Sequence, residues 1–107
     1  YLISLVSNFD ERLNQVLKDL EIYDLLDSRF ISQEVGLEKP DIEFLRLSLK
    51  THNIKSENIF YIGDSYHLDY LPGIKLGLNT YLLDEKGFYP LLLDRVNKLK
   101  ELNKIIM

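Results

Sequence analysis

Apolar runs of strand length alternate with helical patterns along this chain of 107 residues, and that alternation constrains the fold more than any other feature. Four runs rich in Ile, Val, Phe and Tyr predict strands at Tyr1–Ser7, Arg29–Ser32, Ile59–Gly63 and Asn79–Leu83. The first and third runs are continuously apolar, as expected of strands buried on both faces of a parallel sheet.

Helical patterns fill the gaps between the first strands. Ser7 and Asn8 are good N-cap residues, and apolar side chains recur after them at helical spacing, at Leu13, Val16, Leu17 and Leu20. Pro40 suits a first helical turn, and a second helical pattern follows it at Ile42, Leu45 and Leu49.

The later helical segments are less regular. Pro72 and Gly73 interrupt residues 66–76, which predicts one or two turns, a bend and a short helix ending near Gly77. Residues 90–103 predict a last helix, because apolar residues share one side and basic residues come late. Strand and helix thus alternate four times, which predicts a Rossmann-like α/β fold of three layers with a mostly parallel sheet.

The composition excludes several classes of protein. A net charge of −4 argues against nucleic acid as a partner, and the absence of cysteine excludes disulfides and thiolate sites. The chain contains no apolar run of about 18 residues, which is the length needed to span a bilayer. We therefore expect a soluble, cytoplasmic protein with no membrane partner.

Polar residues follow the predicted strands at the positions where ligands bind in open parallel sheets. Ser7 and Asn8 end the first strand, Lys39 lies in the loop after the second, and Asp64 follows the third, with Asp69 in the next turn. Mg²⁺ prefers oxygen ligands, while a hydroxyl and an ammonium suit phosphate oxygens. The set therefore predicts a magnesium and phosphate site.

Each of these residues also has an ordinary structural interpretation. Asn8 with Glu11 forms a near capping box, and Lys39 alone is typical of a solvated loop. Asp64 could belong to a simple turn, and Asp69 to the surface of a helix. Two further pairs are interpreted structurally: His52 and His67 as surface residues without a second metal ligand, and Tyr66 and Tyr70 as packing residues.

Three segments together resemble a known family. LVSN, GLEKPDIEF and IFYIGDSYHLD are similar, in order and separation, to motifs two, three and four of the haloacid dehalogenase superfamily. The GDSYHLDY stretch also resembles the subgroup called haloacid dehalogenase-like hydrolase domain-containing protein 3. The likeness covers nearly the whole chain, and the combination of motifs is more specific than any one of them.

The resemblance implies roles for the polar residues. Ser7 would hydrogen-bond a phosphoryl oxygen with Asn8 beside it, and Lys39 would neutralise the charges of nucleophile and phosphate. Asp64 would ligate Mg²⁺, and Asp69 would ligate it or orient its waters. Because dehalogenases of the superfamily commonly lack the acidic residue after the glycine, the resemblance favours a phosphatase acting on a small phosphorylated metabolite.

One motif of the family is missing. Its reaction runs through an aspartyl-phosphate on the first aspartate of a D-x-D motif, and no two aspartates here are two positions apart. The chain begins in a predicted strand at Tyr1, so we expect residues 1–107 to be the C-terminal half of a hydrolase core, inactive alone and without the motif one strand and the cap. The exposed sheet edge would favour self-association.

Two alternatives remain open at this point. The chain could be a natural truncated relative that serves as a non-catalytic interaction module. A receiver domain, which is also an α/β fold with an acidic site, fits less well, because its lysine should come last in the sequence, whereas Lys39 precedes Asp64.

Overall fold

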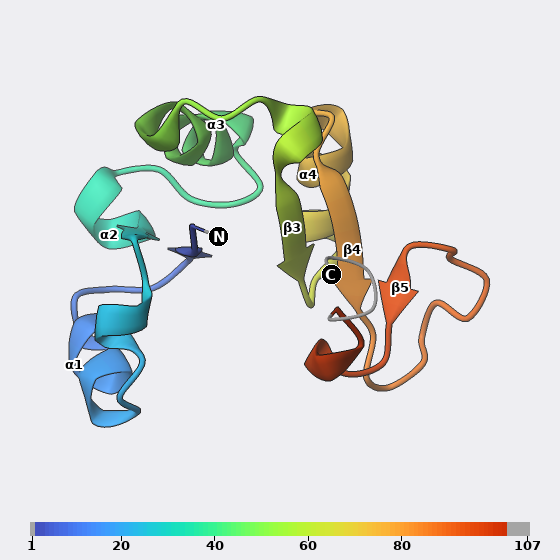
Figure 1. The fold of residues 1–107 in the computed structure, drawn as a ribbon, viewed down its shortest axis with the longest axis horizontal. Helices are drawn as coiled ribbons and strands as arrows, with labels where there is room; N and C mark the ends of the chain where they lie inside the picture. The colour runs from blue at the N-terminus through green and yellow to red at the C-terminus, as the bar shows by residue number, and fades with distance from the viewer. Residues whose placement is uncertain (1, 103–107) are drawn as a thin grey trace. The chain divides into compact units, whose positions relative to one another are not determined.

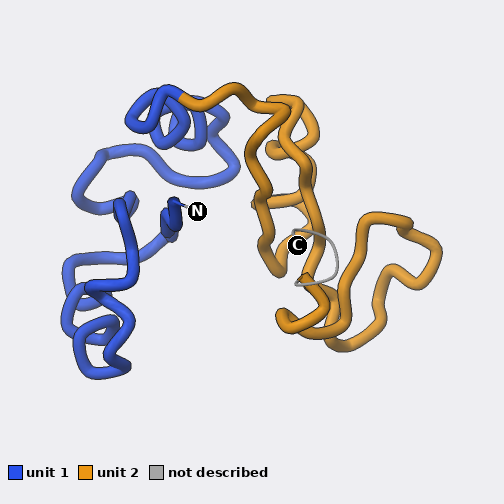
Figure 2. The backbone as a smooth tube through the Cα atoms, viewed as in Figure 1, with its two compact units in different colours: residues 1–53 blue, residues 54–107 orange. Residues whose placement is uncertain are grey.

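The computed structural model describes residues 2–102 and divides into two compact units, residues 1–53 and 54–107 (Figure 2). The ends of two predicted elements, at Tyr1 and Asn103, lie outside the described residues. Each unit contains its own parallel sheet, with β1 and β2 in the first and β3, β4 and β5 in the second (Figure 1).

The first unit is built on two parallel strands. β1 (Ser4–Ser7) pairs with β2 (Ser28–Ile31), so that Ser7 lies opposite Ile31. Helix α1 (Arg12–Asp19) connects the strands, and α2 (Ser32–Val35) and α3 (Ile42–His52) follow β2.

The helices of this unit bury fewer of the predicted apolar residues than their spacing indicates. Leu17 of α1 is buried, but Val16 and Leu20 are 44% and 63% exposed. In α3 the buried side chains include Phe44, which is fully enclosed, and Leu45. The apolar face of α1 is therefore only partly covered in the structure.

Helix α3 begins later than the proline suggested. Asp41 is its N-cap, and its carboxylate accepts a hydrogen bond of 2.9 Å from the backbone N–H of Glu43. Pro40 therefore precedes the cap, and the prediction that it occupies the first turn is wrong. An aspartate at the N-cap satisfies a free backbone N–H group, which proline cannot do.

The second unit holds three parallel strands in sequence order. β3 (Phe60–Gly63) pairs with β4 (Asn79–Leu83), which pairs in turn with the short β5 (Arg95–Val96). A π-helical turn (Tyr66–Tyr70) and helix α4 (Leu71–Lys75) connect β3 to β4.

The break expected at Pro72 is absent. The chain stays helical from Tyr66 to Lys75, and Pro72 lies in the first turn of α4. A proline fits this position because its φ is already close to the helical value. The interruption takes the form of a widened turn, in which the N–H of Tyr70 donates to the carbonyl oxygen of Ser65, five residues earlier.

The predicted last helix over residues 90–103 is wrong. The segment contains β5 instead, followed by a short 3₁₀ turn at Leu99–Glu101. The N–H of Asp84 donates to the carbonyl oxygen of Val96 over 2.8 Å, which ties the segment to the end of β4. Pairing with an existing sheet edge outweighs the weak helical spacing of the apolar residues.

The strands also differ in burial from the predicted pattern. β1 and β3 are only half-buried, whereas β4 alternates buried and half-buried residues. β4 is the central strand of its sheet, and β1 and β3 each pair on one side within theirs. The predicted α/β fold with parallel strands is confirmed. No helix in the described part of the chain has the length and apolar character needed to cross a bilayer.

Candidate functional site

In the first unit, Asn8 at the end of β1 contacts the loop that carries Lys39. Ser7 is the last residue of β1 and is half-buried. The side chain of Asn8 donates to the carbonyl oxygen of Lys39 over 2.9 Å and accepts from the N–H of Lys39 over 2.7 Å. These two hydrogen bonds bring together two predicted site residues that lie 31 positions apart in the sequence.

The capping-box interpretation of Asn8 is wrong. Its side chain bonds to Lys39, and the carboxylate of Asp10 accepts from the N–H of Arg12 instead, over 2.9 Å. The hydrogen bonds from the Arg12 side chain and backbone hold the pKa of Asp10 below its ordinary value. The carboxylate of Asp10 thus accepts from the first residue of α1, while Asn8 bonds to the backbone of Lys39.

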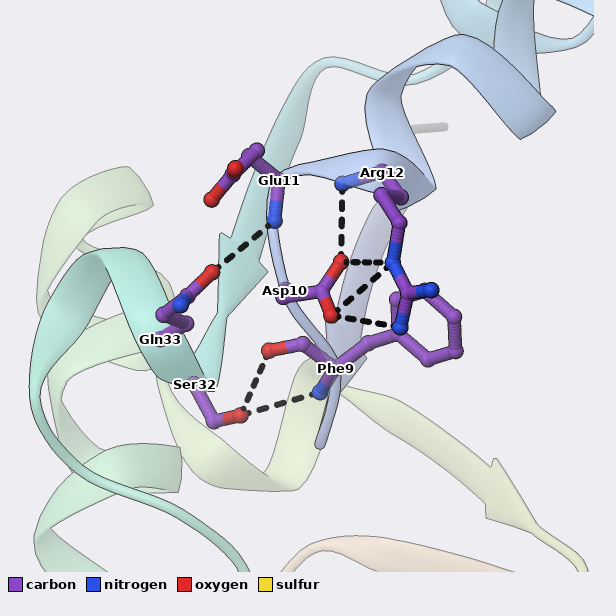
Figure 3. Close-up of polar contacts among 6 residues, drawn as sticks. All are labelled: Phe9, Asp10, Glu11, Arg12, Ser32 and Gln33. Carbon is purple, nitrogen blue, oxygen red and sulfur yellow. Dashed lines mark hydrogen bonds and ion pairs between the residues drawn. The ribbon is translucent and has the colours of Figure 1, made fainter.

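Figure 3 shows how the turn after β1 is fastened to the start of α2. The hydroxyl of Ser32 accepts from the N–H of Phe9 and donates to its carbonyl oxygen, both over 2.9 Å. The side-chain oxygen of Gln33 accepts from the N–H of Glu11 over 3.2 Å. These bonds hold Phe9 and Glu11, which follow Ser7 and Asn8, against the residues directly after β2.

The backbone conformation of Gly36 and Pro40 also shapes the loop that carries Lys39. Gly36 ends α2 with a φ of +86°, a left-handed conformation that favours glycine. Lys39 is half-buried and precedes Pro40 through a cis peptide bond. Two hydrogen bonds with the side chain of Asn8 therefore hold the backbone of Lys39 in place.

In the second unit, Asp64 lies directly after β3, as predicted. Its side chain is exposed and lines a cleft of about 300 Å³. The cleft is lined by residues from the ends of β3 and β4 and from the loop that follows β4: Asp64, Leu83, Asp84, Glu85, Lys86 and Phe88.

Asp69 does not lie on the surface. It is 3% exposed, and its Oδ1 accepts a hydrogen bond of 2.7 Å from the hydroxyl of Tyr61. Its Oδ2 accepts from the N–H of Ser65 over 3.3 Å. Burial raises the pKa of Tyr61, and the charge and hydrogen bond of Asp69 raise it further, so the phenol stays protonated and donates.

The tyrosines of the motif pack as predicted. Tyr66 stacks with both Tyr70 and Tyr89, with ring centroids 5.4 and 5.0 Å apart. His67 is exposed and meets Tyr66 edge-on. His52 is half-buried with its Nε2 2.8 Å from the hydroxyl of Ser28, so the surface interpretation is wrong for this histidine.

Sequence reasoning missed Asp84, which organises the loop beside Asp64. Asp84 is 5% exposed and accepts hydrogen bonds of 2.9 Å from the N–H groups of Phe88 and Tyr89. Arg95 donates to the same carboxylate over 3.0 Å. Burial by itself raises the pKa of Asp84, but these hydrogen bonds outweigh it and hold the pKa below its ordinary value.

The predicted site residues fall into two groups. Ser7, Asn8 and Lys39 belong to the first unit, and Asp64 and Asp69 to the second. Within residues 2–102, no three Asp, Glu or His side chains gather closely enough to hold a metal ion. The shared sheet edge for all five residues therefore stays a prediction.

Comparisons with known proteins identify a family. A profile described as haloacid dehalogenase-like hydrolase matches residues 3–83. The rhythmically expressed gene 2 protein of Drosophila melanogaster is 33% identical over 89 residues, covering 80% of this chain and 34% of the relative. The glyceraldehyde 3-phosphate phosphatase of Methanocaldococcus jannaschii is 34% identical over 93 residues, covering 81% and 40%. Mouse haloacid dehalogenase-like hydrolase domain-containing protein 3 is 32% identical over 81 residues, covering 76% and 32%.

Solved structures share the fold. A phosphatase from Thermococcus onnurineus superposes with a TM-score of 0.90 at 19% identity, over 99% of this chain and 50% of the other. A hydrolase from Bacillus subtilis, described as bound to magnesium, has a TM-score of 0.88 at 23% identity, covering 99% and 48%. The chain thus spans a third to two-fifths of the curated relatives named above and about half of these structures. The profile match covers most of the chain, and the chain belongs to the haloacid dehalogenase-like hydrolase family.

Proposed function

We propose that the protein containing this chain is a Mg²⁺-dependent phosphohydrolase that acts on a small phosphate monoester through an aspartyl-phosphate. Membership of a hydrolase family supports this proposal, as does a relative named as a phosphatase of a small phosphorylated aldehyde. The observation that carries it is the position of Asp64, an exposed carboxylate directly after β3 that lines a cleft.

The carboxylate of Asp64 suits a magnesium ion. Mg²⁺ in enzymes is usually held by one or two carboxylates, with water and substrate oxygens completing its shell. Asp64 offers an exposed carboxylate at an open cleft, so it suits direct ligation. Asp69 is buried and bonded to Tyr61, so we assign it to the orientation of the site. When bound, the ion would neutralise phosphate charge and polarise the phosphoryl group.

The residues of the first unit supply the phosphate contacts in this proposal. The hydroxyl of Ser7 donates a hydrogen bond to a phosphoryl oxygen, and the ammonium of Lys39 neutralises charge that builds up during transfer. Asn8 acts beside Ser7 by holding the backbone of Lys39, because its amide already makes two hydrogen bonds there.

The attacking group comes from outside this chain, since no D-x-D pair occurs in it. A carboxylate attacks phosphorus, the ester P–O bond breaks, and the leaving alcohol takes up a proton. Water then hydrolyses the aspartyl-phosphate and releases inorganic phosphate.

The test is phosphate release by the complete gene product from a panel of small phosphate monoesters. We expect turnover with Mg²⁺, none in excess EDTA, and a rate at least about 100-fold lower after Asp64→Asn. Glu85→Gln is the matched control, because Glu85 lines the same cleft but lies two residues beyond the end of β4 and not directly after a strand. Absence of turnover by the complete protein with every ester would overturn the proposal and favour the interaction module.

A further inference from the structure

The carboxylate of Asp69 contacts both sides of the residue proposed to hold Mg²⁺. It accepts from the N–H of Ser65, the residue after Asp64, over 3.3 Å. On the other side, a Cβ added to Gly63 would collide with the side chain of Asp69. The turn that carries Asp64 is therefore packed directly against Asp69.

Tyr61 fixes Asp69 from the strand. Its hydroxyl donates to Oδ1 of Asp69 over 2.7 Å, while Oδ2 of the same carboxylate faces Ser65. Tyr61 lies in β3, whose pairing with β4 places it opposite Thr80. The hydrogen bond thus connects a residue held by the sheet to the carboxylate that supports the turn.

We propose that Tyr61 is a positioning residue, which orients the carboxylate of Asp69 and, through it, the turn that presents Asp64 to the cation. The inference rests on the proposed function, in which Asp64 binds Mg²⁺. Removal of a group that orients a metal ligand commonly lowers the metal affinity about 10–100-fold.

Tyr70 provides a matched control in the same unit. Its hydroxyl also donates to a carboxylate, that of Asp94, over 3.0 Å, and its side chain is 8% exposed. Asp94 lies just before β5 and not in the turn with Asp64. Tyr61→Phe and Tyr70→Phe therefore each remove one phenol-to-carboxylate hydrogen bond, but only the first removes a bond to Asp69.

The experiment measures Mn²⁺ binding to the complete gene product by the paramagnetic broadening of backbone amide NMR signals. Mn²⁺ is the probe for the Mg²⁺ site, and excess Mg²⁺ should reverse the broadening. In the wild-type protein we expect the signals of residues 63–65 to broaden, and Asp64→Asn to abolish this. Tyr61→Phe should raise the Mn²⁺ concentration for half-broadening about tenfold, whereas Tyr70→Phe should leave it within about twofold.

The outcomes separate the inference from the proposed function. Wild-type broadening that depends on Asp64 but is unchanged by Tyr61→Phe would overturn the role of Tyr61 alone. Absence of any broadening that depends on Asp64 would overturn the metal site itself, and the inference with it.

A second measurement needs no variant and covers the case in which Tyr61→Phe does not fold. Mg²⁺ added to wild-type protein labelled at tyrosine Cζ should shift the ¹³C signal of Tyr61 more than that of Tyr70. Equal shifts, or none, would contradict the inference.

Discussion

Asn8→Ala tests the idea that the end of β1 positions Lys39. The substitution removes a donor and an acceptor that bond to the backbone of Lys39 over 2.9 and 2.7 Å. Each neutral hydrogen bond contributes about 1 kcal/mol net, and water can replace part of it because Asn8 is half-buried. We therefore expect the free energy of unfolding of the first unit to fall by about 1–2 kcal/mol.

Two measurements check this on the 107-residue chain. Urea unfolding gives the loss of stability, and amide hydrogen exchange should show faster exchange at Lys39, whose N–H loses its acceptor. Asn14→Ala is the control, because Asn14 makes a single exposed side-chain bond to Glu34, and its loss should change stability by about 0.5 kcal/mol or less. A loss below about 0.5 kcal/mol for Asn8→Ala, with unchanged exchange at Lys39, would refute the reasoning.

Three further predictions concern stability and turnover. The pKa of Asp84 is lowered in the folded chain, so its stabilising effect is complete above the unfolded pKa of about 3.9 and is lost as the pH falls through the native pKa. Urea unfolding at pH 6 and pH 3 should show a smaller acid-induced loss for Asp84→Asn than for wild type or Glu85→Gln, and equal losses would contradict this. Gly73→Ala should cost about 1–3 kcal/mol, because a Cβ there would meet Thr80 Oγ1 at 2.5 Å and the Tyr61 ring at 2.9 Å; an unchanged urea midpoint would refute it. The 107-residue chain alone should release no phosphate with Mg²⁺, since it has no D-x-D nucleophile, and release abolished by Asp64→Ala would disprove that view.

The sequence predicts the four longer strands well because each depends mainly on a local run of apolar residues. β4 has the predicted bounds, and β3 differs from its prediction by one residue at its start. β5 could not be found in this way. It has two residues, and it forms because Leu82 and Leu83 of β4 lie opposite Arg95 and Val96.

The candidate site was predictable where the rule of strand ends applies. That rule led to Asp64 after β3, and applied to β4 it also finds Asp84, which follows Leu83 directly. The contact of Asn8 with Lys39 was not predictable, because it joins residues 31 positions apart through a side chain that could equally have capped a helix.

The burial of Asp69 was hidden for a different reason. A regular α-helix after Ser65 would make Asp69 one of several candidates for the exposed face, whereas the π-helical turn and the small Gly63 let it pack against the turn before it. The bond from Tyr61 follows from that packing and carries no signal of its own in the sequence.

The central claim is that Asp64 belongs to a magnesium site that serves phosphate hydrolysis. Its most direct test is the rate of phosphate release by the complete gene product at saturating Mg²⁺, measured for wild type and for Asp64→Asn with circular dichroism as a check of folding. We predict that a folded Asp64→Asn protein loses at least about 100-fold in rate, as expected for removal of a metal ligand at the reacting phosphate. A folded Asp64→Asn protein with the wild-type rate would contradict the claim.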